Sequence, residues 1–220
     1  MSVDLSEKYQ RQLDEKTTRV KELLSTFYES TIDIYASQPS NFRMRAEFRM
    51  WHDGPDTYHI MFDKVDKEQY RVDQLAAASK VINSAMQIMT EAFAGNEVLR
   101  RKLFQVDYLS TLTEELLVTM IYHKQLDEEW EAEIQQLKAA FPKHFNVHFI
   151  GRSKKQKVML DNDFVIEKLS IKDKTYQFKQ IENSFTQPNA KVNCSMIEWA
   201  MARVNDKSRD LLELYCGSGN

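Results

Sequence analysis

Hydrophobic and polar residues recur along this chain with two different periods, and the changes of period mark the expected elements. Residues 42–52 place an apolar side chain at every second position with charges between, which predicts a strand with one apolar and one charged face. The turn signal at residues 53–56 and the apolar residues 57–62 predict the returning strand of a hairpin. Residues 103–123 and 147–160 predict two more hairpins.

Three segments between these strands have apolar residues at helical spacing: 6–28, 75–93 and 127–141. The first is amphipathic and is expected to pack on a sheet, and Asp127 is expected to cap the third. Strands that arrive in adjacent pairs, with helices between the pairs, are typical of an antiparallel α+β domain.

The pattern changes near residue 180. A polar loop at 184–189 precedes a predicted helix with Pro188 in its first turn and an apolar stripe at Met196, Ile197, Trp199, Ala200 and Val204. A short apolar run at 211–215 then ends at Gly217 and Gly219, which is typical of a buried parallel strand that enters a ligand loop. With Asn220 the loop fits either a dinucleotide fingerprint or the first loop of an S-adenosylmethionine methyltransferase.

Composition narrows the class of protein. The chain has 42% hydrophobic residues, so it can bury a core, and it lacks both an apolar run of membrane-spanning length and a signal peptide. We therefore expect a cytoplasmic protein without membrane contact. Two cysteines, Cys194 and Cys216, are too few for a metal knuckle or an iron–sulfur cluster and are expected to be free thiols.

Charge argues against bulk attraction to nucleic acid, because the net charge is −3. The basic residues are nevertheless grouped. Three clusters could each meet phosphates locally: Arg43, Arg45 and Arg49; Arg100, Arg101 and Lys102; Arg152, Lys154, Lys155 and Lys157.

Four segments, in order and at matching spacing, resemble the bacterial tRNA (uracil-5-)-methyltransferase family. They are 42–49 (FRMRAEFR), 102–108 (KLFQVDY), 182–189 (ENSFTQPN) and 210–220 (DLLELYCGSGN). The resemblance implies S-adenosyl-L-methionine as cofactor, no metal, and methylation of uracil C5 in the T-loop of tRNA, with transfer-messenger RNA (tmRNA) as a further substrate. In that family a cysteine in a Ser-Cys-Asn-Pro context attacks uracil C6 and a glutamate removes the C5 proton. The Ser-Cys-Asn-Pro motif does not occur here, and the glutamate lies near the C-terminus in that family, so both catalytic residues are expected beyond Asn220 and the chain alone is expected to be inactive.

The resemblance also implies site residues. Gln187, Tyr215, Gly217 and Asn220 match cofactor-binding positions, and Arg49, Phe104 and His123 match RNA contacts. Without the resemblance, the residues alone leave other interpretations open: Gln187 as a solvated loop residue, Tyr215 and Phe104 as core aromatics, His123 as a strand cap, and the charged strand face as merely solvated.

The expected organisation is therefore an antiparallel-sheet RNA-recognition domain at 1–178. It is followed at 179–220 by the incomplete start of a class I (Rossmann-like) methyltransferase domain, in a monomer that binds the T-arm of tRNA. A non-catalytic tRNA-binding or RNA-folding module is the alternative. A nicotinamide-dependent oxidoreductase is disfavoured by Asn220 and by the long antiparallel region ahead of the glycine loop.

Overall fold

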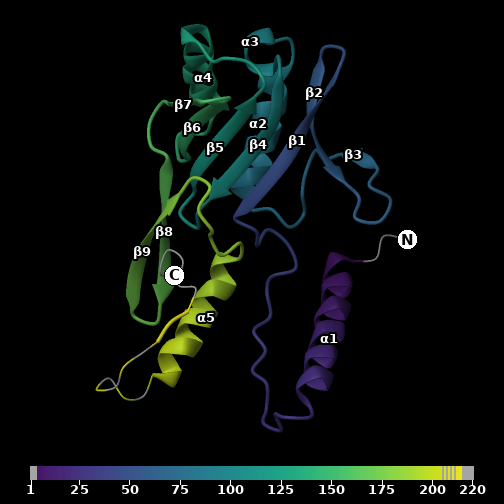
Figure 1. The fold of residues 1–220 in the computed structure, drawn as a ribbon, viewed down its shortest axis with the longest axis vertical. Coiled ribbons are helices and arrows are strands. Elements are labelled where there is room, and N and C mark those ends of the chain that lie inside the picture. The colour runs from purple at the N-terminus through teal and green to yellow at the C-terminus, as the bar shows by residue number, and fades with distance from the viewer. Residues whose placement is uncertain (1–3, 205, 207, 209, 211, 215–220) are drawn as a thin grey trace.

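A seven-stranded sheet forms the centre of the computed structural model, which describes residues 4–204, 206, 208, 210 and 212–214 (Figure 1). The strand order is β3-β2-β1-β4-β5-β6-β7. The strands are β1 (Arg45–Asp53), β2 (Asp56–Phe62), β3 (Gln69–Arg71), β4 (Leu103–Ser110), β5 (Glu115–Tyr122), β6 (Asn146–Ser153) and β7 (Gln156–Met159). All three predicted hairpins are confirmed.

One pairing in this sheet corrects the wholly antiparallel prediction. β5 and β6 run parallel, with Val118 opposite Phe149 in the register. The reason is the crossover: α4 (Glu128–Ala140) carries the chain back along the sheet, so β6 enters in the same direction as β5. The fold is mixed α+β, with mostly antiparallel pairing.

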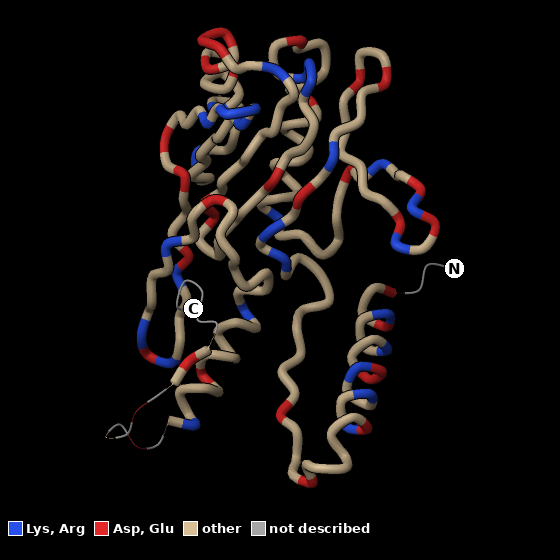
Figure 2. Tube along the Cα trace, in the orientation of Figure 1, with Lys and Arg blue, Asp and Glu red and all other residues tan. Residues whose placement is uncertain are grey.

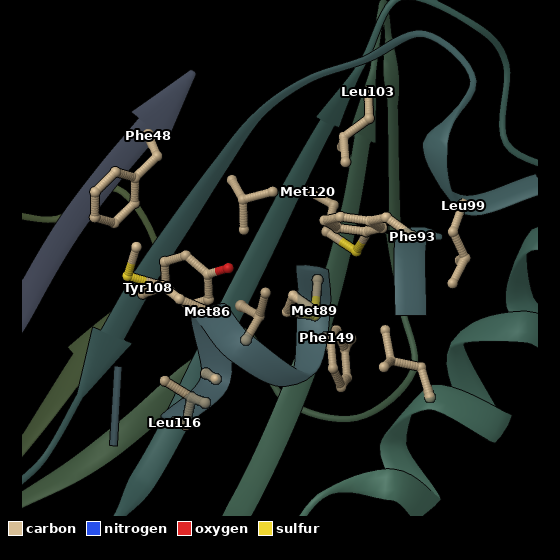
Figure 3. Close-up of a cluster of buried hydrophobic side chains, with 14 of the residues drawn as sticks. Phe48, Met86, Met89, Phe93, Leu99, Leu103, Tyr108, Leu116, Met120 and Phe149 are labelled. Atoms are coloured by element: carbon tan, nitrogen blue, oxygen red, sulfur yellow. The ribbon is translucent and has the colours of Figure 1, made fainter. Parts of the chain in front are cut away.

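Helices α2 (Lys80–Phe93), α3 (Glu97–Arg100) and α4 cover one face of the sheet. The core between them is built from Phe48, Met86, Met89, Phe93, Tyr108, Met120 and Phe149 (Figure 3). Asp127 caps α4 as predicted, accepting a hydrogen bond from the Trp130 backbone at 3.0 Å. α2 begins later than the expected residue 75 because Ser79 caps it through the Ile82 backbone. Gly151 lets α4 approach β6, since a Cβ there would lie 2.5 Å from the Trp130 ring of α4.

Part of the opposite face is covered by two strands that the sequence patterns did not predict and by the predicted helix after them. β8 (Phe164–Ile171) and β9 (Lys174–Ile181) form a two-stranded sheet, on which α5 (Ala190–Arg203) packs. Val165 of β8 closes a small apolar cluster with Leu109, Leu117 and Ile150. The face around Phe104 and Ile121 stays accessible to solvent.

Two helix predictions are wrong in part. α1 (Leu5–Leu24) does not pack on a sheet: it stands apart from it, no residue of the described helix is buried, and Leu23 is 70% exposed (Figure 1). Its link to the next segment is the Tyr9 hydroxyl, which accepts a hydrogen bond from the Ser37 backbone at 2.6 Å. Pro188 lies before α5, not in its first turn, because Asn189 is the N-cap.

The C-terminal predictions are corrected or lie outside the described residues. Most of the predicted apolar stripe of α5 is exposed, including Met196 and Trp199, and Ile197 packs on the β8–β9 side. Residues 212–214 of the predicted strand form no strand, and residues 211 and 215–220 lie outside the described part. Within the described residues, no helix has the length and apolar character that crossing a membrane requires.

Glu167 of β8 has a buried carboxyl, and the residue is only 1% exposed. Its Oε1 accepts hydrogen bonds from the Leu112 and Lys168 backbones at 3.0 and 3.1 Å, and no described residue bonds to its Oε2. Burial raises the pKa of Glu167 from 4.5 to about 7.

We expect this carboxyl to make the fold less stable as pH rises. Glu167 ionises near pH 4.5 in the unfolded chain but only near pH 7 in the folded chain. The contribution of Glu167 to the free energy of unfolding is therefore fully present below pH 4.5 and is lost as the pH rises to about 7. Between pH 4.5 and 8, the free energy of unfolding of Glu167→Gln should therefore rise by about 1–3 kcal/mol relative to that of the wild type. Urea unfolding across this range checks it, with Glu131→Gln on the exposed side of α4 as control. A pH-independent difference between Glu167→Gln and wild type would contradict the expectation.

Candidate RNA interface

Three residues predicted as RNA contacts come together in one row across the sheet. The Arg49 guanidinium of β1 lies 3.9 Å from the Phe104 ring centre of β4. The His123 ring, just after β5, stacks on Phe104 with centres 4.4 Å apart and planes inclined by 25°. Because β4 lies between β1 and β5, Arg49 and His123 reach Phe104 from its two sides. We call these three residues the stacking row.

The local backbone explains why Phe104 points outward. Leu103 pairs with Tyr122 and Gln105 pairs with Ile121, so Phe104 is an extra residue between two ladder positions. A bulge of this kind re-aims one side chain without ending the strand. Phe104 is 37% exposed while Leu103 is 2% exposed, so the interpretation of Phe104 as a core residue is wrong.

The His123 end of the stacking row is also held in place by hydrogen bonds to the backbone. His123 donates its backbone N–H to the Lys102 carbonyl at 2.9 Å, which ties the end of β5 to the start of β4. His52, one strand away, is held by its ring nitrogens to Thr57 Oγ1 at 3.0 Å and to the Leu103 carbonyl at 2.8 Å. His52 therefore braces the strands beneath the row.

The predicted basic cluster at 100–102 is wrong in part, because Arg100 is buried. Only 9% exposed, it donates to Thr57 Oγ1 at 3.0 Å and to the Asp56 carbonyl at 3.2 Å. It also bonds to the Gly54 carbonyl and Glu97. Arg100 is thus a clamp on the β1–β2 turn, and only its neighbours Arg101 and Lys102 are exposed to a partner.

Carboxylates are interleaved with the basic residues on this face. Glu182 accepts two hydrogen bonds from Arg152, at 2.5 and 2.7 Å, and its Oε2 lies 3.2 Å from Lys157. Burial opposes ionisation of Glu182, but these two cations hold its pKa below the ordinary value. Asp107 accepts from Gln105 at 2.7 Å, and burial raises the pKa of Asp107 to about 6. Near neutral pH Asp107 can therefore act as acceptor or, in its protonated fraction, as donor.

Gln187 is the one predicted cofactor residue within the described part of the chain. It is half-buried in the segment between β9 and α5, and that segment is anchored to the start of β1. Arg45 donates to the Ser184 carbonyl at 2.8 Å, and the Met44 backbone donates to the Pro188 carbonyl at 2.7 Å. A pocket of about 580 Å³ adjoins the segment and is lined by Arg43, Arg45, Ala46, Glu47, Phe48, Met61, Leu75, Ala77, Phe185, Thr186 and Pro188.

The other predicted cofactor residues, Tyr215, Gly217 and Asn220, lie outside the described residues. Cys194 is a free, half-buried thiol as predicted, and burial raises its pKa, which keeps it protonated. Cys216 lies outside the described part. In the described ranges, no group of three or more His, Cys, Asp or Glu side chains could hold a metal ion.

Lys124, which follows His123 at the end of β5, is a further basic residue beside the stacking row that the sequence patterns did not single out. Its Nζ donates to the Val98 carbonyl at 2.6 Å. A single lysine after a strand carries no sequence signal, because its neighbours in space come from segments distant in the chain.

Arg49, Phe104 and His123 form an exposed row on the sheet of an α+β fold. The family model for tRNA (Uracil-5-)-methyltransferase matches residues 8–220, so the chain belongs to this family. The expected family is therefore confirmed.

Two relatives give the similarity in numbers, and both are named tRNA/tmRNA (uracil-C(5))-methyltransferase. The protein of Photobacterium profundum is 52% identical over 213 residues, 96% of this chain. That of Pseudoalteromonas atlantica is 54% identical over 212 residues, also 96% of this chain. The chain spans 58% of the length of each relative.

A solved structure shares the fold. It is the tRNA (uracil-54, C5)-methyltransferase of Pyrococcus abyssi in complex with S-adenosyl-L-homocysteine, with a TM-score of 0.62 and 15% sequence identity. The match covers 90% of this chain and 49% of that chain. At this identity the likeness concerns the fold alone.

Proposed function

We propose that the protein to which this chain belongs transfers a methyl group from S-adenosyl-L-methionine to C5 of a uracil in the T-loop of tRNA. Transfer-messenger RNA is the proposed second substrate, in line with the names of the relatives. The observation that carries the proposal is the stacking row of Arg49, Phe104 and His123, in a chain that belongs to this family. With tRNA as substrate, the cytoplasm is the proposed compartment and one chain per tRNA the proposed stoichiometry.

The row suits the first physical step of the reaction. A uracil inside a folded loop is stacked, so an enzyme must unstack it and stabilise the opened loop. Phe104 already has a partner on each side, so RNA bases must extend the row at its ends or displace one member. Each stacked base contributes about 1–3 kcal/mol, which offsets the loss of stacking within the loop.

The proposed cofactor site consists of Gln187 together with Tyr215, Gly217 and Asn220. The Gln187 amide can both donate and accept hydrogen bonds at a polar edge of the cofactor. Anchoring of residues 184 and 188 to Arg45 and Met44 supports this role, because it fixes the backbone on either side of Gln187. S-adenosylmethionine would supply the methyl group there.

We propose a division of labour in which residues 1–178 recognise RNA and residues 179–220 begin the methyltransferase domain. The family's Ser-Cys-Asn-Pro motif does not occur in the 220 residues, so the chain alone is proposed to bind RNA without turnover. An RNA-binding or RNA-folding module is the second candidate, favoured by the position of the whole stacking row within these residues.

Methyl transfer by a completed protein tests the proposal. This chain would be joined to the remaining residues of the Photobacterium profundum relative and incubated with labelled S-adenosylmethionine and a T-arm stem-loop RNA. We expect label in RNA with uridine at the target position and none when 5-methyluridine is already there. A folded chimera without transfer, beside an active relative, would contradict the proposed function and favour the binding module.

A further inference from the structure

A groove of about 860 Å³ lies where β5 and β6 end. Because these strands are parallel neighbours, their carboxyl ends meet at one edge of the sheet. Residues 121–125 form one wall and the β6–β7 turn at 152–155 forms the other. His123 belongs both to this groove and to the stacking row.

The groove concentrates positive charge in a chain that is acidic overall. Its lining includes Lys124, Arg152, Lys154 and Lys155 and no aspartate or glutamate, whereas the whole chain carries a net charge of −3. Figure 2 shows basic positions near the ends of β5 and β6, next to the acidic start of α4, whose Asp127 and Glu129 interact electrostatically with Lys124. Such a groove attracts anions, and a row of phosphates most strongly.

Hydrogen bonds hold the two walls of the groove at a fixed separation. Ser153 donates its hydroxyl to the Lys124 carbonyl. The Gln156 amide accepts from the Leu126 N–H and donates to the Leu126 carbonyl, both at 3.0 Å. The groove therefore exists before any ligand arrives, which lowers the entropic cost of binding.

The four cations fall into two pairs. Arg152 and Lys124 are fixed, the first by Glu182 and the second by the Val98 carbonyl. Lys154 and Lys155 at the turn are exposed, and neither ammonium is bonded to another residue within the described part of the chain. The charge available to a ligand thus comes mainly from Lys154 and Lys155.

We propose that this groove binds backbone phosphates of the RNA strand that continues from the base stacked at His123. The inference rests on the proposed function and adds a phosphate-binding site to it. Phosphate contacts position an RNA without reading its sequence. Loss of the groove should therefore weaken binding of a T-arm stem-loop and of a scrambled stem-loop alike, whereas loss of the stacking row should reduce the preference between them.

The test is the salt dependence of RNA binding by the 220-residue chain, measured by fluorescence anisotropy with a labelled T-arm stem-loop. The groove variant is Lys154→Gln with Lys155→Gln. The matched control is Lys172→Gln with Lys174→Gln, which removes the same charge from the β8–β9 turn. Both turns contain a lysine at positive φ, 65° at Lys155 and 54° at Lys172, so the backbone conformation is matched too.

We expect the slope of log Kd against log salt to fall by about 1.4–1.8 in the groove variant, for two phosphates at about 0.7–0.9 each. The control should keep the wild-type slope. Three results would contradict phosphate binding in the groove. They are an unchanged slope in the groove variant, an equal fall of the slope in the control, and no RNA binding by the wild-type chain. Failure of methyl transfer in the chimera with the expected slopes would instead overturn the proposed function alone.

Discussion

Replacing Phe104 with alanine is expected to raise the Kd for a T-arm stem-loop about 5- to 150-fold, equivalent to about 1–3 kcal/mol. Phe104 is the central member of the stacking row, with Arg49 at 3.9 Å and His123 at 4.4 Å. Without its ring, the guanidinium and the imidazole lose the surface that orients them, so bases lose the whole platform.

Fluorescence anisotropy with the 220-residue chain measures this effect. Phe104→Leu should lose most of the same affinity, because it keeps apolar volume but not the flat ring. Phe27→Ala removes another exposed phenylalanine, which lies just after α1, and should leave the Kd unchanged. A wild-type Kd for Phe104→Ala, with an unchanged circular dichroism spectrum, would mean that no base relies on the row.

Replacing Arg100 with methionine is expected to lower the free energy of unfolding by about 2–4 kcal/mol. Methionine keeps the apolar stem but removes the hydrogen bonds that Arg100 donates to the Thr57 hydroxyl and to the carbonyls of Gly54 and Asp56. The β1–β2 turn would then lose its connection to α3.

Urea unfolding of Arg100→Met and Arg101→Met checks this prediction side by side. Arg101 is adjacent, equally charged and exposed, so its substitution should change the free energy of unfolding by no more than about 0.5 kcal/mol. Equal effects of the two substitutions would contradict the assignment of Arg100 as a structural clamp.

The pattern of neighbouring residues predicted those features that depend only on neighbouring residues. The β1–β2 and β4–β5 hairpins follow from period-two alternation and turn residues, and Asp127 from the chemistry of helix capping. The parallel β5–β6 pairing depends on where α4 carries the chain, which no local window contains. β8 was missed because Glu167 interrupts its apolar alternation with a buried charge-bearing group.

The candidate site was predicted by family resemblance more than by pattern. Periodicity cannot distinguish an exposed Phe104 from a core one, because its exposure depends on a bulge against β5. Nor could it separate the buried Arg100 from the exposed Arg101 beside it, since the two differ only in which distant carbonyls they reach. α1 has the apolar spacing of a packed helix and yet no residue of the described helix is buried.

We propose that these 220 residues recognise RNA without the rest of the protein. The most direct test is binding of the 220-residue chain to a T-arm stem-loop and to a scrambled stem-loop, by fluorescence anisotropy at two salt concentrations. We predict that the T-arm binds about tenfold or more tightly than the scrambled RNA, and that this preference persists at the higher salt concentration. Equal affinity for the two RNAs, or no binding of either, would contradict RNA recognition by these residues alone.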